Sequence, residues 1–191
     1  MEAKPQDRRV RRTRKLLKEG LTELLKEKPF SEISAKEITD RKDLNRATFY
    51  LHYKSTYELL QDVEDDFFRQ AQEMFDERMQ GFTGGSIRPV FEGFLDYIVE
   101  NQSLCDALIS NDASSDFINR AYSFIHDNGE SILRGMYPGT SEDRMEYLLG
   151  FTCYGLIGMV KNWFDHDMNM DKEDLLDLAD VLVENNTRVL Q

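Results

Sequence analysis

Apolar residues recur at helical spacing along most of the 191-residue chain. In the first part of the chain this pattern predicts four helices, over 10–26, 35–41, 46–52 and 55–80. Further apolar stripes predict five more helices, over 87–101, 103–111, 115–137, 141–166 and 171–190. The GFTGGS stretch at 81–86 interrupts the pattern between the two sets. We therefore expect an all-α protein.

Local signals fix the ends of the two short helices. Ser34 and Glu37 have the spacing of a capping box, in which each side chain binds a free N–H group of the first turn. Asn45 can cap the next helix, and only three residues separate the two helices, which leaves room for a turn alone. Ser55 and Glu58 repeat the capping-box spacing at the start of the long helix. The pattern predicts a helix-turn-helix.

The second short helix has an inner and an outer face. Phe49 and Tyr53 lie on the inner face, whereas Arg46, Ala47 and Tyr50 lie on the outer face. An arginine, a small residue and an aromatic hydroxyl near the amino end of a short helix suit the major groove of DNA. An ordinary corner between two helices fits the same spacing.

The residues of this stretch resemble the DNA-binding domain of the TetR family of bacterial regulators. The matching positions are Arg14, Leu17, Leu21, Leu24, Phe30, Ile33, Ile38, Asn45, Arg46, Ala47, Thr48, Phe49, Tyr50, His52, Tyr53, Lys54, Glu58, Leu59 and Leu60. In two places the chain departs from the family, with Asp43 where Gly is usual and Thr56 where Lys is common. The resemblance implies a three-helix DNA-binding domain at 1–54, joined to a larger helical domain at 55–191 that binds an effector and dimerises.

The same resemblance implies roles for single residues on DNA. Contacts with base edges are expected from Arg46, Ala47 and Tyr50, with His52 as a further candidate. Contacts with phosphates are expected from Thr48, Tyr53, Lys54 and the helix start at Ser55, and Asn45 completes the DNA-binding set. The implied target is a palindromic operator in double-stranded DNA, bound by a homodimer.

The distribution of charge is compatible with this interpretation, although the chain carries a net charge of −12. Residues 1–54 hold 15 Lys and Arg against 9 Asp and Glu, whereas residues 55–191 hold 9 against 27. The amino-terminal part is therefore basic, as neutralising phosphates requires. Residues 1–12 form a polar arm containing Arg8, Arg9, Arg11 and Arg12, which suits either a DNA-binding arm or a solvated terminus.

The carboxyl-terminal part is rich in aromatic residues. Such residues suit a mostly apolar pocket for a small-molecule effector, and they suit plain core packing equally well. The candidate pocket residues are Phe91, Phe94, Tyr97, Phe117, Tyr122, Phe151 and Tyr154.

The last two predicted helices carry apolar residues on more than one face. A helix that is apolar on opposite sides must be covered on both, and a second copy of the chain is the simplest partner. The run from Gly155 to Met168 also resembles the closing helices of TetR-type regulators, including the dihydroxyacetone-kinase activator group. We expect a four-helix homodimer interface formed by Leu156, Met159, Val160, Trp163, Leu175, Leu178 and Leu182.

Other classes of function find less support. No zinc-protease, phosphate-loop, nucleophile-elbow or dinucleotide motif is present, and Asp165, His166 and Asp167 point in different directions on a helix. We therefore predict no catalytic site, metal or cofactor. Without a signal peptide or a run of about 20 apolar residues, the chain is expected to be cytoplasmic. A helical adaptor with a basic head and an all-helical enzyme remain as alternatives.

Overall fold

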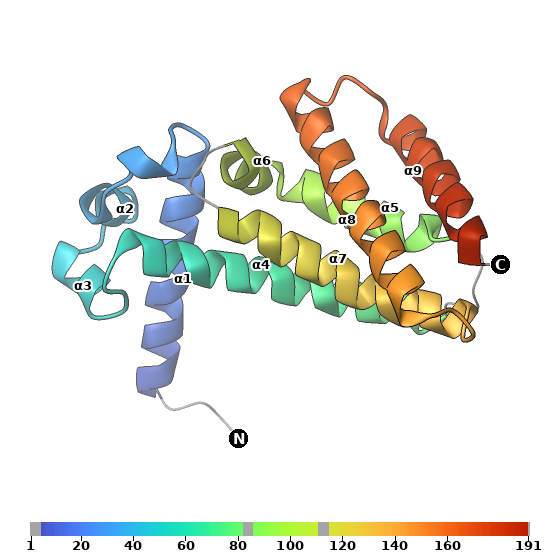
Figure 1. The fold of residues 1–191 in the computed structure, drawn as a ribbon. Coiled ribbons are helices and arrows are strands. Elements are labelled where there is room, and N and C mark those ends of the chain that lie inside the picture. The colour runs from blue at the N-terminus through green and yellow to red at the C-terminus, as the bar shows by residue number, and fades with distance from the viewer. Residues whose placement is uncertain (1–4, 82–85, 111–114, 191) are drawn as a thin grey trace. The chain divides into compact units, whose positions relative to one another are not determined.

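The computed structural model describes residues 5–81, 86–110 and 115–190, and this part of the chain is helical without strands (Figure 1). Its elements are α1 (Pro5–Leu25), η1 (Phe30–Glu32), α2 (Ala35–Arg41), α3 (Arg46–Tyr50), α4 (Thr56–Met79), α5 (Arg88–Glu100), α6 (Gln102–Ser110), α7 (Ser115–Met136), α8 (Glu142–Asp165), α9 (Lys172–Thr187) and η3 (Arg188–Leu190). The all-α prediction is confirmed, because every predicted helix is present and most ends agree within two residues.

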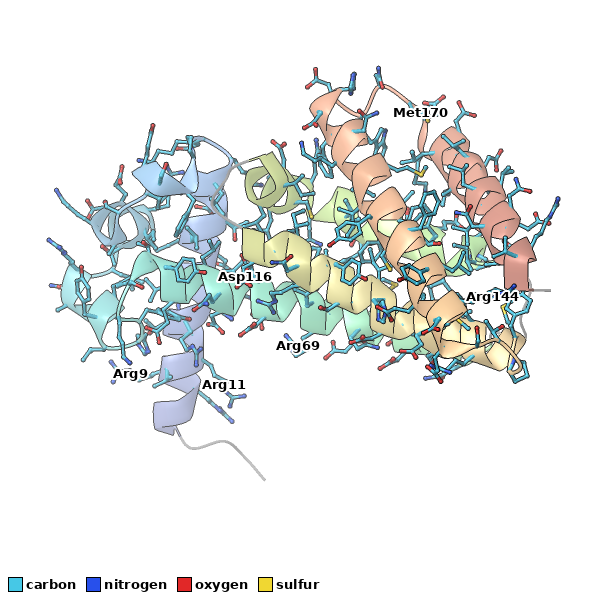
Figure 2. All side chains as sticks on the ribbon, viewed as in Figure 1. Arg9, Arg11, Arg69, Asp116, Arg144 and Met170 are labelled. Carbon is cyan, nitrogen blue, oxygen red and sulfur yellow. The ribbon has the colours of Figure 1, made fainter. Side chains whose placement is uncertain are left out.

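One predicted boundary is wrong. The helix predicted to start at residue 10 begins at Pro5, so α1 includes the arginines of the polar arm, among them Arg9 and Arg11 (Figure 2). Proline suits the first turn of a helix, where its missing N–H group has no partner to lose. Residues 1–4 and most of the GFTGGS stretch lie outside the described residues.

Contacts divide the chain into two compact units, residues 1–69 with 103–113 and residues 70–102 with 114–191. We call residues 5–69 the head and the described residues of the second unit the body. The helix α4 contributes to both units, whereas the predicted functional boundary lies at 54/55, just before this helix. That functional boundary stays a prediction.

The head is built around side chains that contact no solvent. Leu17 and Leu21 of α1, Ile38 of α2, Phe49 of α3 and Leu59 of α4 each have an exposed fraction of zero. For Leu17, Leu21, Ile38 and Phe49 this burial agrees with the inner faces that the apolar periodicity predicts. The small core therefore fixes α3 against its three neighbours.

The body packs α5, α7, α8 and α9 with the second half of α4. Figure 1 shows α8 and α9 side by side in this unit. Two sets of ion pairs join α5 to α9: Arg88 contacts Glu173 at 2.7 Å and also Asp177, and Lys172 contacts Asp96 at 2.6 Å. Within the described residues, no helix has the length and apolarity to cross a membrane.

Candidate nucleic-acid interface and cavity

The predicted caps hold the helix-turn-helix in place. The Ser34 hydroxyl accepts from the Glu37 N–H group, and the Glu37 carboxylate accepts from the Ser34 N–H group at 3.0 Å. The Asn45 side chain accepts from the Ala47 N–H group at 2.8 Å and so caps α3. Between these helices Asp43 has a φ of 51°, in the left-handed region that Gly adopts freely and Asp tolerates. Asp43, which stands where the family usually has Gly, therefore adopts a backbone conformation that Gly would also allow.

The outer face of α3 presents the predicted base-reading residues to solvent. Arg46, Ala47 and Tyr50 are all exposed. The Arg46 guanidinium lies 5.6 Å from the centre of the Tyr50 ring, and its Nη2 donates to the Tyr50 hydroxyl at 3.3 Å. Leu51 follows with an exposed fraction of 81%. The face thus combines a cation, an aromatic hydroxyl and an aliphatic group, three chemistries that can read base edges.

A groove of about 420 Å³ runs beside this face of α3. The first turns of α2 and α4 border it, and three cationic side chains line it, from Lys36, Arg46 and Lys54. At its edge the Ser55 hydroxyl caps α4 by accepting from the Glu58 N–H group at 3.2 Å. The positive end of the α4 dipole therefore adds to the charge of the cations, and the groove suits a phosphate backbone.

The sequence interpretation missed Lys36. A cation in the first turn of a helix is unfavourable, because the dipole there is already positive. Lys36 occupies that place, as the second residue of α2 after the cap at Ser34. The unfavourable position was a signal that could have indicated contact with an anion.

Tyr53 lies on the inner face, as its spacing predicts, and this placement does not suit the phosphate contact expected of it. Its side chain is only 3% exposed, its hydroxyl donates to the Asp62 carboxylate at 2.5 Å, and Arg14 Nε donates to it at 3.1 Å. Lys18 also contacts Asp62, at 2.9 Å, and Asp66, at 2.6 Å. The hydroxyl that was expected to bind a phosphate is instead engaged between α1 and α4.

The charges in this cluster stabilise one another. Burial and the hydrogen bond to Asp62 raise the pKa of Tyr53 well above its ordinary value, so the hydroxyl stays protonated and can donate. Burial favours a higher pKa for Asp62, but hydrogen bonds from Tyr53, Lys18 and Arg14 outweigh it and lower the pKa. The cluster thus connects the end of the recognition segment to α1 and α4 through an ionised carboxylate.

The body contains an apolar cavity of about 110 Å³. Its walls come from α4, α5, α7, α8 and α9, and the ring of Phe124 stacks on Phe94 with 5.6 Å between ring centres. Its lining residues are Met74, Phe75, Ile87, Val90, Phe91, Phe94, Phe124, Ile125, Asn128, Gly129, Ile132, Leu133, Leu149, Thr152, Cys153, Leu156, Val183 and Thr187. Of the seven predicted pocket residues, Phe91 and Phe94 belong to this wall, whereas Tyr97, Phe117, Tyr122, Phe151 and Tyr154 do not.

Few polar groups reach the cavity, and most of these are satisfied within the protein. The Asn128 amide donates to the Phe124 carbonyl at 2.8 Å and pairs with Gln72 at 3.1 Å. Thr187 donates to the Glu184 carbonyl at 3.0 Å. The hydroxyl oxygen of Thr152 is buried and has no hydrogen-bond partner among the described residues. It is an orphaned polar atom in an otherwise apolar wall.

Comparison with known proteins supplies the family. The family model TetR_C_8, described as "Transcriptional regulator C-terminal region", matches residues 85–185, which is more than half of the chain. The chain belongs to the TetR family of transcriptional regulators. A second match, 44% identical over 58 residues, is to the uncharacterized HTH-type transcriptional regulator YxbF of Bacillus subtilis (strain 168). That match covers 30% of this chain and 15% of YxbF.

Solved structures of TetR-type regulators have the same fold. A TetR transcriptional regulator from Streptococcus agalactiae 2603V is 25% identical, with a TM-score of 0.71 over 93% of this chain and 97% of that one. A TerR/AcrR family regulator from Aquifex aeolicus VF5 is 22% identical, with a TM-score of 0.64 over 93% and 99%. The dihydroxyacetone kinase operon activator DhaS, at 13% identity, has a TM-score of 0.60 over 93% of both chains.

In this TetR-family chain α8 and α9 both expose large apolar residues, but most of the residues predicted for the dimer interface are not among them. Leu156, Val160, Trp163 and Leu175 were assigned to a dimer interface and are instead buried within the subunit. Met159 is half-buried, and only Leu178 and Leu182 of the predicted set are exposed. The large apolar residues that α8 and α9 expose, which we call the outer stripe, are Tyr147, Phe151, Tyr154, Leu178, Val181 and Leu182.

The described residues offer little for metal chemistry. No group of three or more His, Cys, Asp or Glu side chains gathers within them in a way that could hold an ion. The His166 ring nitrogen Nδ1 lies 2.8 Å from the Asn162 carbonyl, at the end of α8. The relatives found by comparison are transcriptional regulators.

Proposed function

We propose that the chain is a homodimeric transcriptional regulator that binds a palindromic DNA operator through its head and is controlled by a small molecule in its body. The observation that carries the proposal is the groove beside α3, where Lys36, Arg46 and Lys54 meet the start of α4. DNA presents one negative charge per roughly 1.7 Å of duplex, so a groove of clustered cations beside an exposed helix suits a phosphate backbone.

Two kinds of contact divide the recognition surface. Arg46, Ala47 and Tyr50 read base edges, and His52, which is half-buried, is a further candidate. Thr48, Lys54 and Ser55 contact phosphates, and Lys36 joins them because it lines the same groove. Tyr53 leaves this set, since its hydroxyl is engaged inside the head, and we assign it a positioning role. Asn45 positions α3 as its cap.

The outer stripe supports a dimer. Tyr147, Phe151 and Tyr154 are exposed by 82%, 68% and 62% on one face of α8, and α9 adds three aliphatic residues. Large apolar side chains exposed together on two neighbouring helices are typical of a protein interface. Pairing of α8 and α9 across a two-fold axis would bury it in a four-helix bundle and would present two heads to two half-sites.

The dimer can be tested by charge. Phe151→Glu places a carboxylate on the stripe and is expected to convert the dimer to monomers in sedimentation velocity. Val99→Glu is the matched control, because Val99 is also exposed but lies on α5, away from the stripe. Equal behaviour of the two variants would contradict the proposed interface.

The cavity supports control by an effector. Its apolar wall suits a small, largely apolar ligand. A bound ligand would stabilise the arrangement of the body helices that binds it most tightly. It would therefore shift the population of conformations towards that arrangement.

The groove can be tested by the salt dependence of DNA binding. Each lost phosphate contact should lower the slope of log K against log salt by about 0.9. We expect that loss from Lys36→Ala and from Lys54→Ala on all sequences alike, and none from Lys26→Ala. Lys26 is an exposed lysine of the head that does not line the groove. If Lys26→Ala lowers the slope as much as Lys36→Ala and Lys54→Ala do, the groove is not the binding site of the DNA backbone.

A further inference from the structure

The apolar cavity of the body adjoins a second hollow of about 290 Å³. The two share four wall residues, Ile87, Leu133, Val183 and Thr187. We call the apolar cavity the inner chamber and the second hollow the mouth, because the wall of the latter includes the exposed residue Glu184. The two hollows therefore adjoin, and a ligand that reaches from one into the other has to pass between these four side chains.

The two spaces differ in charge. No residue with a charged side chain lines the inner chamber, and burial raises the pKa of its Cys153 thiol to about 11, so this group also stays neutral. A charged ligand group placed there would lose its hydration without compensation. The part of a ligand that enters the inner chamber must be uncharged.

The mouth contains two carboxylates, from Asp180 and Glu184. Glu184 faces the guanidinium of Arg188 at 3.3 Å, which offsets part of its charge. Asp180 is half-buried, accepts a hydrogen bond from the Ser86 hydroxyl at 2.6 Å, and has no ion pair with a cation of the described residues. The nearby cation Arg88 is occupied by Glu173 and Asp177 on the same helix. The mouth therefore has an uncompensated negative charge at Asp180.

We propose, resting on the effector function proposed above, that the ligand is an apolar amine whose hydrocarbon body fills the inner chamber and whose protonated amine binds Asp180 in the mouth. A carboxylate or phosphate at the same place would be repelled by Asp180. A neutral end group would bind without the ionic contribution. Charge at the mouth thus selects amines over alcohols, and alcohols over acids.

The size of the inner chamber limits the hydrocarbon body. An engineered apolar cavity of about 150 Å³ encloses benzene, and the inner chamber, at about 110 Å³, is of the same order. A short alkyl chain or a single small ring fits this volume. Affinity should rise about fourfold for each added methylene until the chamber is full.

The test uses three ligand series on the purified full chain without DNA. Straight-chain amines, alcohols and carboxylates of four to ten carbons are titrated by calorimetry. At the optimal length we expect the amine to bind at least about tenfold more tightly than the carboxylate, with the alcohol between them, and the difference to shrink at high salt. Equal or tighter binding of the carboxylate, or no binding of any series, would overturn the proposal.

A pair of variants locates the charge. Asp180→Asn should weaken amine binding about threefold to tenfold and leave alcohol binding unchanged. Asp174→Asn is the matched control, since it removes the same charge from α9 at an exposed position outside both hollows, and it should change neither. If both variants weaken amine binding equally, the selectivity is a long-range effect of net charge and Asp180 is not the binding group.

The failure of this inference can be separated from failure of the DNA-binding function. DNA binding by the same preparation is followed by fluorescence anisotropy. Amine binding without any DNA binding would contradict the regulator proposal and leave the amine site intact. DNA binding without amine binding would contradict the amine site alone.

Discussion

The Tyr53 hydroxyl offers a sharp test of how the recognition segment is held. In Tyr53→Phe the ring remains in the core, but the hydrogen bond to Asp62 at 2.5 Å and the one from Arg14 at 3.1 Å are lost. Hydrogen bonds to charged groups contribute about 1.5 to 3 kcal/mol each. Because Asp62 keeps Arg14 and Lys18 at 2.9 Å each, its carboxylate is not left unpaired. We expect the head to lose about 1.5 kcal/mol.

Hydrogen exchange read by mass spectrometry can assign this loss to the head. Since about 1.4 kcal/mol corresponds to a factor of ten, amides of α1 and of the first part of α4 should exchange about tenfold faster, and those of α8 should be unchanged. Tyr57→Phe is the matched control, because Tyr57 is an exposed tyrosine of α4, and it should alter exchange in neither unit.

Unchanged hydrogen exchange in the head of Tyr53→Phe together with weaker DNA binding would contradict the positioning role of the Tyr53 hydroxyl. That combination is expected if the hydroxyl contacts a phosphate directly, as the sequence interpretation had it. Equal acceleration in α1 and α8 would instead indicate a global effect with no particular role for the cluster.

Three further predictions concern stability. Hydrogen bonding to Lys28 and then to Ser34 lowers the pKa of Glu37 to about 2, so the ionised carboxylate stabilises the head fully above pH 4.5 and this stabilisation is lost as pH falls towards 2. In an acid titration followed by circular dichroism, Glu37→Gln should therefore unfold less steeply with pH in that window than the natural chain. Equal steepness would contradict the assignment. Thr152→Val removes a buried hydroxyl without a hydrogen-bond partner and should raise the free energy of unfolding of the ligand-free body by about 1 kcal/mol. Urea unfolding followed by Trp163 fluorescence measures this change. Destabilisation would mean that the hydroxyl has a partner. A methyl group at Gly93 would lie 2.0 Å from Arg78 Nε and would displace the Arg78 side chain from its hydrogen bond to the Pro89 carbonyl. Gly93→Ala should therefore stabilise the body by about 1 kcal/mol in an Arg78→Ala background, where the clash is absent, and by less in the natural chain. An equal effect of Gly93→Ala in both backgrounds would show that residues 93 and 78 do not interact.

The features that the sequence predicted well depend on neighbours in the chain. The capping residues Ser34, Asn45 and Ser55 act within one helical turn. Their spacing along the chain therefore indicated where α2, α3 and α4 begin. The inner residue Phe49 followed from periodicity in the same way.

The features that the sequence did not predict depend on distant contacts. Both stripes of α8 are apolar, so periodicity could not tell that Leu156 and Trp163 face their own subunit while Phe151 and Tyr154 face solvent. The partners of Tyr53 lie 39 and 9 residues away, on α1 and α4. The cavity wall combines residues of five helices, and only Phe91 and Phe94 among them were predicted to line a pocket.

Selection from a random DNA pool can show whether the head reads a DNA sequence as one half of a two-fold pair. Purified full chain is incubated with a random duplex library at near-physiological salt, and bound sequences are amplified and read over several rounds. We expect an inverted repeat whose half-sites lie about 10 base pairs apart or at a multiple of this spacing, and whose enrichment is lost in Arg46→Ala. Binding without enrichment of any sequence, or enrichment that Arg46→Ala leaves intact, would contradict this expectation.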